Sequence, residues 1–176
     1  VVLLKQQGHA VRAKIIAKDV WKQAEYRAFL LARVAAGGVE REVQFNFEGV
    51  SEQGLCEAYR ASDVFLLTAH VPPPQGYGWG LVAFEAASAG WPVVVNRETG
   101  AAHVWTDGEN ALFASPGKPE EYASQVAHLL KDHGFYRRIA EEGQRFVREN
   151  LSWERYAREM MELYKATSNK GQRTRG

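Results

Sequence analysis

Two closely spaced glycines in the middle of the chain lie just before a predicted helix, an arrangement that can bind an anionic ligand. Gly78 and Gly80 lie two residues apart, and a helix-forming stretch begins directly after them. Glycine lacks a Cβ atom, so the backbone there can approach a ligand closely. The first amides of a helix carry unpaired N–H groups and a partial positive charge. We therefore expect the amides of Gly80, Leu81 and Val82 to bind a diphosphate.

One carboxylate follows these amides along the same helical stretch. Glu85 lies one turn further in. An ionised carboxylate can accept two hydrogen bonds from neighbouring hydroxyls, which is how a ribose is held in many nucleotide sites. The alternative is that the glycines only form a tight turn and that Glu85 caps or salt-bridges its own helix. Two glycines at this spacing are a weak signal, so the residues alone leave both interpretations open.

Two other residues have side chains that could be reactive. Cys56 is the single cysteine, so neither an internal disulfide nor a cysteine-rich metal site can form. It shares an apolar pattern with Leu55, Tyr59 and Val64, and we expect it to fill the core. His103 stands alone in a short predicted helix, where a histidine is more often structural than chemical.

Strands and helices are predicted to alternate through the first two thirds of the chain. The predicted strands are residues 11–18, 43–47, 64–67, 93–95 and 111–114, and the predicted helices are 21–36, 52–59 after an N-cap at Ser51, 81–89 and 100–105. Three amphipathic helices are expected to follow, from Pro119 to Leu130 and at 135–150 and 152–167.

This order of elements predicts an α/β fold and places the glycine loop within it. Residues 64–67 and 93–95 are apolar without alternation, which is typical of strands buried on both faces. A parallel sheet with helices on both faces satisfies such strands. Ligands bind such sheets at the carboxyl ends of the strands, so we expect the site in the loop at 71–80. A flavodoxin-like signalling domain shares the alternation but needs clustered acidic residues after its first strand, where only Asp19 is found.

Length and charge limit the other possibilities. A chain of 176 residues can bury one core, and we expect one domain over residues 1–167 and a disordered tail over 168–176. The Met and aromatic stripe of the last helix is expected to be a packing surface and not a cofactor site. The 22 basic and 21 acidic residues give no reason to expect a nucleic-acid or membrane partner. The opening apolar run stops at Lys5, far short of the roughly 18 residues of a membrane span. These features predict a soluble, cytoplasmic protein.

Four segments in order carry a resemblance to a known family. They are FEGV at 47–50 with YRASDVFLL at 59–67, GWGLVAFEAASAGWPVV at 78–94, TDGENAL at 106–112 and LSWERY at 151–156. From about Phe45 to Tyr164 the sequence resembles the C-terminal domain of glycosyltransferase family 4 (group 1), retaining enzymes with the two-domain GT-B fold. The resemblance implies a Rossmann-like parallel sheet with helices on both faces, followed by C-terminal helices.

The same resemblance implies a reaction for the intact enzyme. A retaining hexosyltransferase of this type moves a glycosyl group from a nucleoside diphosphate sugar, here a UDP- or GDP-sugar, to a sugar, lipid or other acceptor. It implies no metal and no separate cofactor. The acceptor would be bound by an N-terminal domain that this chain lacks. The family's first strand, with an arginine and a lysine against the diphosphate, would precede Val1, so we expect the chain alone to be inactive.

The resemblance also implies roles for individual residues. The family signature has two glutamates eight positions apart, and Glu85 matches the second, which commonly holds the ribose. Tyr77 stands where the first would face the donor sugar beside Gly78. Val50 and Ser51 are then assigned to the flanks of the base, and no catalytic residue is assigned.

Two departures from the family pattern leave a second interpretation open. Tyr77 replaces a carboxylate by a phenol, and residues 99–103 keep only the second glycine, Gly100, of the family's Gly-Gly-x-Pro-Glu segment. The alternative function is a catalytically inactive nucleotide-binding module.

Overall fold

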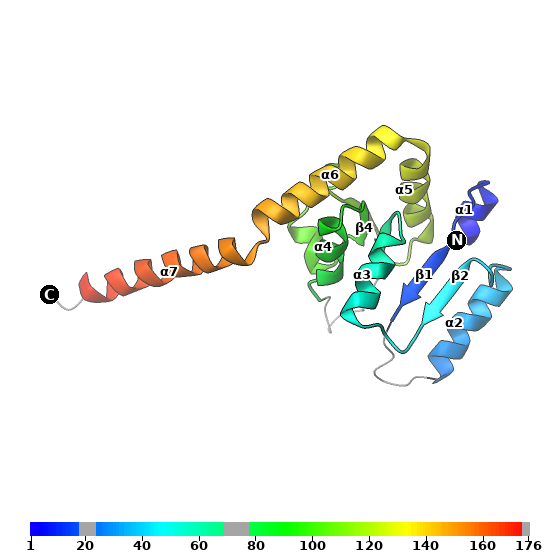
Figure 1. Cartoon of the computed structure of the whole chain (residues 1–176), viewed down its shortest axis with the longest axis horizontal. Coiled ribbons are helices and arrows are strands. Elements are labelled where there is room, and N and C mark those ends of the chain that lie inside the picture. Colours follow the sequence, from blue (N-terminus) through cyan, green and yellow to red (C-terminus); the bar gives the residue numbers. More distant parts are fainter. Residues whose placement is uncertain (18–23, 69–77, 174–176) are drawn as a thin grey trace.

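The alternation of strands and helices predicted from the sequence is confirmed. The computed structural model describes residues 1–17, 24–68 and 78–173, and their side chains as far as residue 167. Its elements are α1 Val2–Gln6, β1 Ala13–Ile16, α2 Ala24–Ala36, β2 Val43–Asn46, α3 Glu52–Arg60, β3 Phe65–Leu67, α4 Leu81–Ser88, β4 Val93–Asn96, the 3-10 helix η1 Gly100–His103, β5 Leu112–Ala114, α5 Pro119–Lys131, α6 His133–Asn150 and α7 Trp153–Arg173. Figure 1 shows their arrangement.

All paired strands are parallel, as predicted, but they form two hydrogen-bonded sets. Strand β1 pairs with β2, with Ala13 opposite Val43. Strand β4 lies between β3 and β5, with Val94 opposite both Leu66 and Leu112. Within the described ranges no ladder joins β1 to β3. The Rossmann-like α/β fold with helices around parallel strands is therefore confirmed, and among the described residues β1 and β3 each have a hydrogen-bonded partner strand on one edge.

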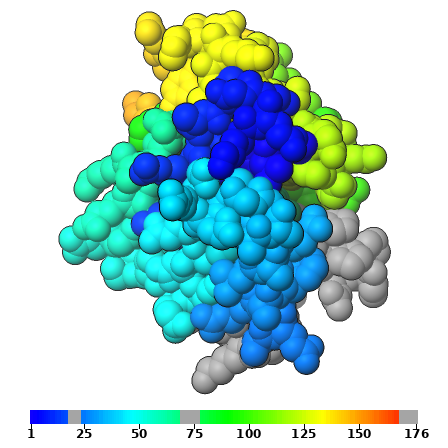
Figure 2. Space-filling model, turned by 90° about the vertical axis from the view of Figure 1, so that its right-hand side faces the viewer, coloured from blue at the N-terminus to red at the C-terminus, as the bar shows by residue number. Residues whose placement is uncertain are grey.

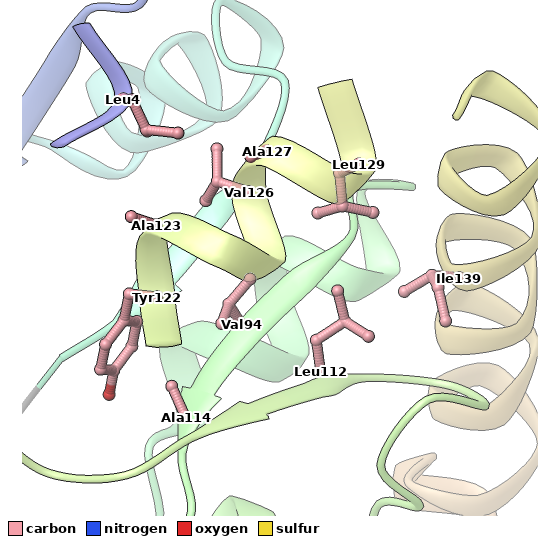
Figure 3. Close-up of a cluster of buried hydrophobic side chains, with 10 residues drawn as sticks. All are labelled: Leu4, Val94, Leu112, Ala114, Tyr122, Ala123, Val126, Ala127, Leu129 and Ile139. Atoms are coloured by element: carbon pink, nitrogen blue, oxygen red, sulfur yellow. The ribbon is translucent and has the colours of Figure 1, made fainter. Parts of the chain in front are cut away.

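The core lies on the two faces of β4. All four of its residues are buried, and because successive side chains point to opposite faces, Val94 packs in one cluster while Val93 and Val95 pack in the other. The first cluster is covered by α5 and α6, and Figure 3 shows Ile139 reaching from α6 toward Leu112 of β5. The second is covered by α4 and η1, where the Phe84 and Trp105 rings lie 4.6 Å apart.

The short helix α1 closes one side of the first cluster. Its Leu4 is buried against α5 residues, and Figure 3 draws it beside Ala123 and Val126. In Figure 2 the dark blue residues of α1 lie between the yellow-green of α5 and the blue of α2. Residues far apart in the sequence therefore share this face.

The predicted starts of α5 and α6 differ only slightly from those in the structure. Pro119 occupies the first turn of α5, as predicted. Helix α6 begins at His133 and not at 135, because the Asp132 side chain caps it by accepting a hydrogen bond from the Phe135 amide at 2.9 Å. Helix α6 packs on α4, and a Cβ atom added at Gly143 would lie 3.9 Å from Cβ of Ala87 on α4 and 2.8 Å from the carbonyl oxygen of Asn110, which precedes β5.

Helix α7 departs from the expectation made for it. Ser152 caps it as predicted, accepting a hydrogen bond from the Arg155 amide at 3.2 Å. Its stripe does not pack against the core, since Trp153 is 82% and Tyr164 61% exposed, and Figure 1 shows the helix extending away from the body. The prediction of packing is wrong because helical spacing of apolar residues shows that a helix has an apolar face, not where its partner comes from.

Three observations on the described residues bear on other expectations. The backbone of α7 remains helical as far as Arg173, and the tail at 168–176 stays a prediction. No helix in these ranges has the length and apolar character to cross a bilayer. Nor do these ranges contain a group of three or more potential metal ligands.

Candidate functional site

The glycine loop joins the carboxyl end of β3 to α4, as the sequence predicted. Gly80 is the N-cap of α4 and has a φ of 72°, a left-handed conformation that favours glycine. A Cβ atom there would also lie 2.6 Å from Cδ2 of Leu67, the last residue of β3. The conformation therefore favours glycine at this position, and any larger residue would also require the Leu67 side chain to shift.

The first turn of α4 presents backbone donors at this edge of the sheet. The first amides of a helix have no partner within it, and those of Leu81 and Val82 follow the N-cap directly. Both side chains are exposed, while Ala83, Phe84 and other inner residues of α4 are buried. The partial positive charge of the helix start is thus available to an anion.

The loop after β4 lies against the glycine loop. The Gly100 amide donates a hydrogen bond to the Gly78 carbonyl oxygen at 3.3 Å. A Cβ atom at Gly100 would lie 3.0 Å from Cα of Trp79, so the one glycine kept from the altered 99–103 segment allows two loops to touch. At Gly78 itself, no atom of the described residues beyond its chain neighbours would lie within 4 Å of an added Cβ atom.

Glu85 lies on the exposed part of α4, one turn beyond the free amides. Its Oε2 atom accepts a hydrogen bond from the Tyr59 hydroxyl at 3.1 Å, and the same hydroxyl lies 3.1 Å from the Val82 carbonyl oxygen. In the part of the chain that the structure describes, Glu85 forms no salt bridge. The alternative interpretation of Glu85 as an ion-pairing residue of its own helix therefore has no support in these contacts.

Tyr59 is a residue of this site that sequence reasoning did not assign to it. Burial, and then the neighbouring Glu85 carboxylate, raise the pKa of the Tyr59 phenol above its usual range. The phenol therefore keeps its proton and acts as a donor toward the carboxylate. The only signal in the sequence is the place of Tyr59 at the start of the 59–67 segment, which says nothing of a partner 26 residues away.

The remaining predicted ligand residues lie near the ends of other strands or outside the described residues. Ser51 caps α3, and its Oγ atom accepts a hydrogen bond from the Gly54 amide at 3.1 Å. Val50 beside it is 37% exposed. Both follow β2, and their assignment to the base stays a prediction. Tyr77 lies outside the described residues, so its contact with the donor sugar also stays a prediction.

The two residues singled out for reactive side chains lie on the surface. Cys56 is exposed, so its prediction as a core residue is wrong. Ala58 is the buried residue of α3, with Leu55 and Tyr59 beside it on the same face, and Cys56 is rotated by about 100° from Leu55 on a helix of 3.6 residues per turn. His103 is exposed on η1.

This fold, with its helix start at the carboxyl ends of parallel strands, is the Rossmann-like C-terminal domain of GT-B glycosyltransferases. The chain belongs to the family described as glycosyl transferases group 1, whose model matches residues 2–146. The narrower assignment to family 4 stays a prediction.

Curated relatives are similar over most of this chain. An uncharacterized glycosyltransferase of Methanocaldococcus jannaschii is 31% identical over 128 residues, 73% of this chain and 31% of the relative. Mannosylfructose-phosphate synthase of Agrobacterium fabrum is 30% identical over 134 residues, 76% of this chain and 28% of the enzyme. D-inositol 3-phosphate glycosyltransferase of Rhodococcus jostii is 33% identical over 116 residues, 65% of this chain and 24% of the enzyme. The chain thus spans less than a third of the length of each.

Solved structures share the fold at lower identity. The C-terminal domain of the group 1 glycosyl transferase LpcC from Francisella tularensis has a TM-score of 0.76 and 19% identity, covering 86% of this chain and 75% of that one. Anabaena HepE, solved in complex with UDP-glucose, has a TM-score of 0.78 and 21% identity, covering 94% of this chain and 44% of that one.

Proposed function

We propose that the chain is the donor domain of a retaining glycosyltransferase and binds a nucleoside diphosphate sugar, with UDP or GDP as its nucleotide, at the start of α4. The observation that carries this proposal is the geometry at Gly80, a left-handed N-cap that lies against Leu67 at the end of β3 and places the first amides of α4 there. The likeness in fold to HepE, whose structure contains UDP-glucose, supports it.

Each part of the donor then has a counterpart in the chain. The amides of Gly80, Leu81 and Val82 would bind the diphosphate, and the Glu85 carboxylate would accept hydrogen bonds from the ribose hydroxyls. Both lie within the first two turns of α4. The sugar would lie beside Tyr77 and Gly78.

The base would lie beyond the ribose, toward the start of α3. Val50 and Ser51 are the residues that we assign to its flanks, since they follow β2 at the N-cap of α3.

Transfer itself is proposed for a longer protein. Because the chain spans less than a third of each curated relative, we assign binding of the acceptor to a further domain. The reaction would pass the glycosyl group from the nucleoside diphosphate to a hydroxyl of that acceptor with retention at the anomeric carbon. This chain's part is to hold the leaving diphosphate with backbone donors that are already oriented.

A second candidate function is a nucleotide-binding module without transfer. The phenol of Tyr77 in place of a carboxylate and the altered 99–103 segment favour it. Assays on the full-length protein separate the two, since nucleotide affinity without turnover of any nucleotide sugar would support the module, and turnover would exclude it.

Substitution of Glu85 tests the proposed site. Glu85→Gln keeps the size of the side chain and removes its charge, and hydrogen bonds to a charged group are worth roughly 1.5–3 kcal/mol. We expect the affinity for UDP or GDP, whichever binds more tightly, to fall by about tenfold to a hundredfold in calorimetry. The melting temperature should stay within about 2 °C of the wild type.

The matched control is Glu141→Gln, which changes an exposed glutamate on α6. It should leave both the affinity and the melting temperature unchanged. A Glu85→Gln variant with unchanged nucleotide affinity and a lowered melting temperature would assign Glu85 to the stability of α4 and remove it from the site.

A further inference from the structure

We propose that Tyr59 is a positioning residue that orients the Glu85 carboxylate toward the ribose of the nucleotide. This inference rests on the proposed function, because it gives Tyr59 a role only through Glu85. The observation behind it is the contact between two helices: the Tyr59 hydroxyl of α3 lies 3.1 Å from Oε2 of Glu85 on α4.

The Tyr59 ring is itself held in place. It is partly buried and packs against the second core cluster, with its centroid 6.2 Å from that of Phe65 on β3. Its hydroxyl also lies 3.1 Å from the Val82 carbonyl oxygen in the first turn of α4, a second acceptor that shares the single phenol proton with Glu85. A donor held by these contacts is a better anchor than a solvent-exposed side chain would be, because little ordering entropy remains to be lost when the ligand binds.

Glu85, by contrast, is exposed and needs such an anchor. A glutamate side chain has three rotatable bonds, and on an exposed helix face it samples several rotamers. The hydrogen bond to Oε2 restricts it to those that face Tyr59. Only one lone pair of Oε2 is used by this bond, so Oε1 and the second lone pair of Oε2 remain for two vicinal hydroxyls.

The protonation states favour this direction of donation. Burial and the Glu85 carboxylate both raise the pKa of Tyr59, so the proton stays on the phenol oxygen at neutral pH. The bond is therefore a charge-assisted one from a neutral donor to a carboxylate, which is stronger and more directional than a neutral pair.

Tyr59→Phe removes the hydroxyl and keeps the ring. We expect the affinity for UDP, measured by calorimetry on the 176-residue chain, to fall by about threefold to tenfold, as for the loss of one hydrogen bond. The affinity for 2′,3′-dideoxyuridine diphosphate, which has no ribose hydroxyls, should not change. In a Glu85→Gln background, Tyr59→Phe should have little further effect on UDP binding.

Tyr136→Phe is the matched control. Tyr136 is partly buried, like Tyr59. Its hydroxyl donates a hydrogen bond to the backbone oxygen of Asp63 at 2.7 Å. It should lower stability about as much as Tyr59→Phe does while leaving the affinities for both nucleotides unchanged.

The outcomes separate the inference from the proposed function. If wild-type protein does not bind UDP, the proposed site fails. Suppose instead that the wild type binds UDP and that Glu85→Gln lowers this affinity. The positioning role is then overturned if Tyr59→Phe leaves the affinity for UDP unchanged, or if it lowers the affinities for UDP and for the dideoxy analogue equally.

A second variant covers the case in which Tyr59→Phe does not fold. Tyr59→Leu also removes the hydroxyl and keeps an apolar side chain beside Phe65. Both nucleotides bind the same folded protein, so the ratio of their affinities does not depend on the folded fraction. The preference for UDP over the dideoxy analogue should fall as it does for Tyr59→Phe, and a preference equal to that of the wild type would contradict the proposal.

Discussion

At the scale of residues, three glycines differ in backbone conformation and in the space around them. Gly80 combines a positive φ with the close approach of Leu67. Gly108 has a positive φ of 78°, and Gly78 has none. At both positions, no atom of the described residues beyond the chain neighbours lies within 4 Å of an added Cβ atom. Alanine substitutions at the three positions therefore distinguish the free-energy cost of a left-handed backbone from the additional cost of a steric clash.

We predict that alanine at these three positions destabilises the chain in the order Gly80, Gly108, Gly78. Gly108→Ala should cost about 1–2 kcal/mol, the penalty of a left-handed conformation. Gly80→Ala should cost more, since Leu67 must also move, and Gly78→Ala should stay within about 0.5 kcal/mol. Urea denaturation measures all three, and equal effects at Gly80 and Gly78 would show that the N-cap geometry is wrong.

A second prediction at this scale concerns alkaline pH. The raised pKa of Tyr59 means that the folded state favours the protonated phenol more than the unfolded state does. Its contribution to stability is therefore complete below the ordinary tyrosine pKa of about 10 and is lost as the pH rises above that value. The difference in unfolding free energy between wild type and Tyr59→Phe should narrow as the pH rises past about 10. A constant difference up to about pH 11 would contradict the buried, carboxylate-facing placement of the phenol.

The residues of the candidate site could be predicted from the sequence where their relation depends on neighbours in the same segment. The glycine pair and Glu85 lie in one short segment, and helix geometry alone relates them. The link from Tyr59 to Glu85 joins two helices, and no spacing in the sequence predicts it. The placement of Cys56 in the core is wrong for a related reason, since a mixed apolar pattern over one short helix does not settle which side faces the core.

At the scale of elements, α5 and α6 are amphipathic and packed, whereas α7 is amphipathic and extends from the body. All three helices could be predicted from their apolar spacing and caps. Which of them finds a partner in this chain could not, because the spacing is the same in both cases. The pairing of the strands could not be predicted either, since the alternation of β and α indicates parallel strands but not the break between β1 and β3.

We predict that replacing a large side chain by alanine is costly in the packed helix α5 and nearly neutral in the extended helix α7. Leu129 of α5 is fully buried, so Leu129→Ala should cost about 2–5 kcal/mol of unfolding free energy. Trp153 of α7 is 82% exposed, so Trp153→Ala should change it by less than about 0.5 kcal/mol. Denaturant unfolding of the chain measures both, and a large loss in Trp153→Ala would show that α7 packs on the body in solution.

At the scale of the whole molecule, the described residues form their core on the two faces of β4, and α4 begins near the carboxyl end of β3. Its family is shown by the match over residues 2–146, and its fold by solved structures of glycosyltransferases. The α/β class, and the place of the glycine loop after the carboxyl end of β3, could be predicted from the order of the elements, because parallel strands present their carboxyl ends on one side. Donor, base and acceptor could not, since their contacts lie in loops and in other parts of a longer protein.

The central claim is that the start of α4 binds the diphosphate of a nucleotide. Calorimetric titration of UDP and GDP into the purified chain tests it most directly, with uridine and guanosine as matched ligands that lack the diphosphate. The claim predicts a dissociation constant of about 1 mM or below for at least one of the two nucleotides, and binding at least about tenfold weaker for its nucleoside. If the chain is folded by circular dichroism and neither nucleotide binds at millimolar concentration, or if nucleoside and nucleotide bind equally, the claim is contradicted.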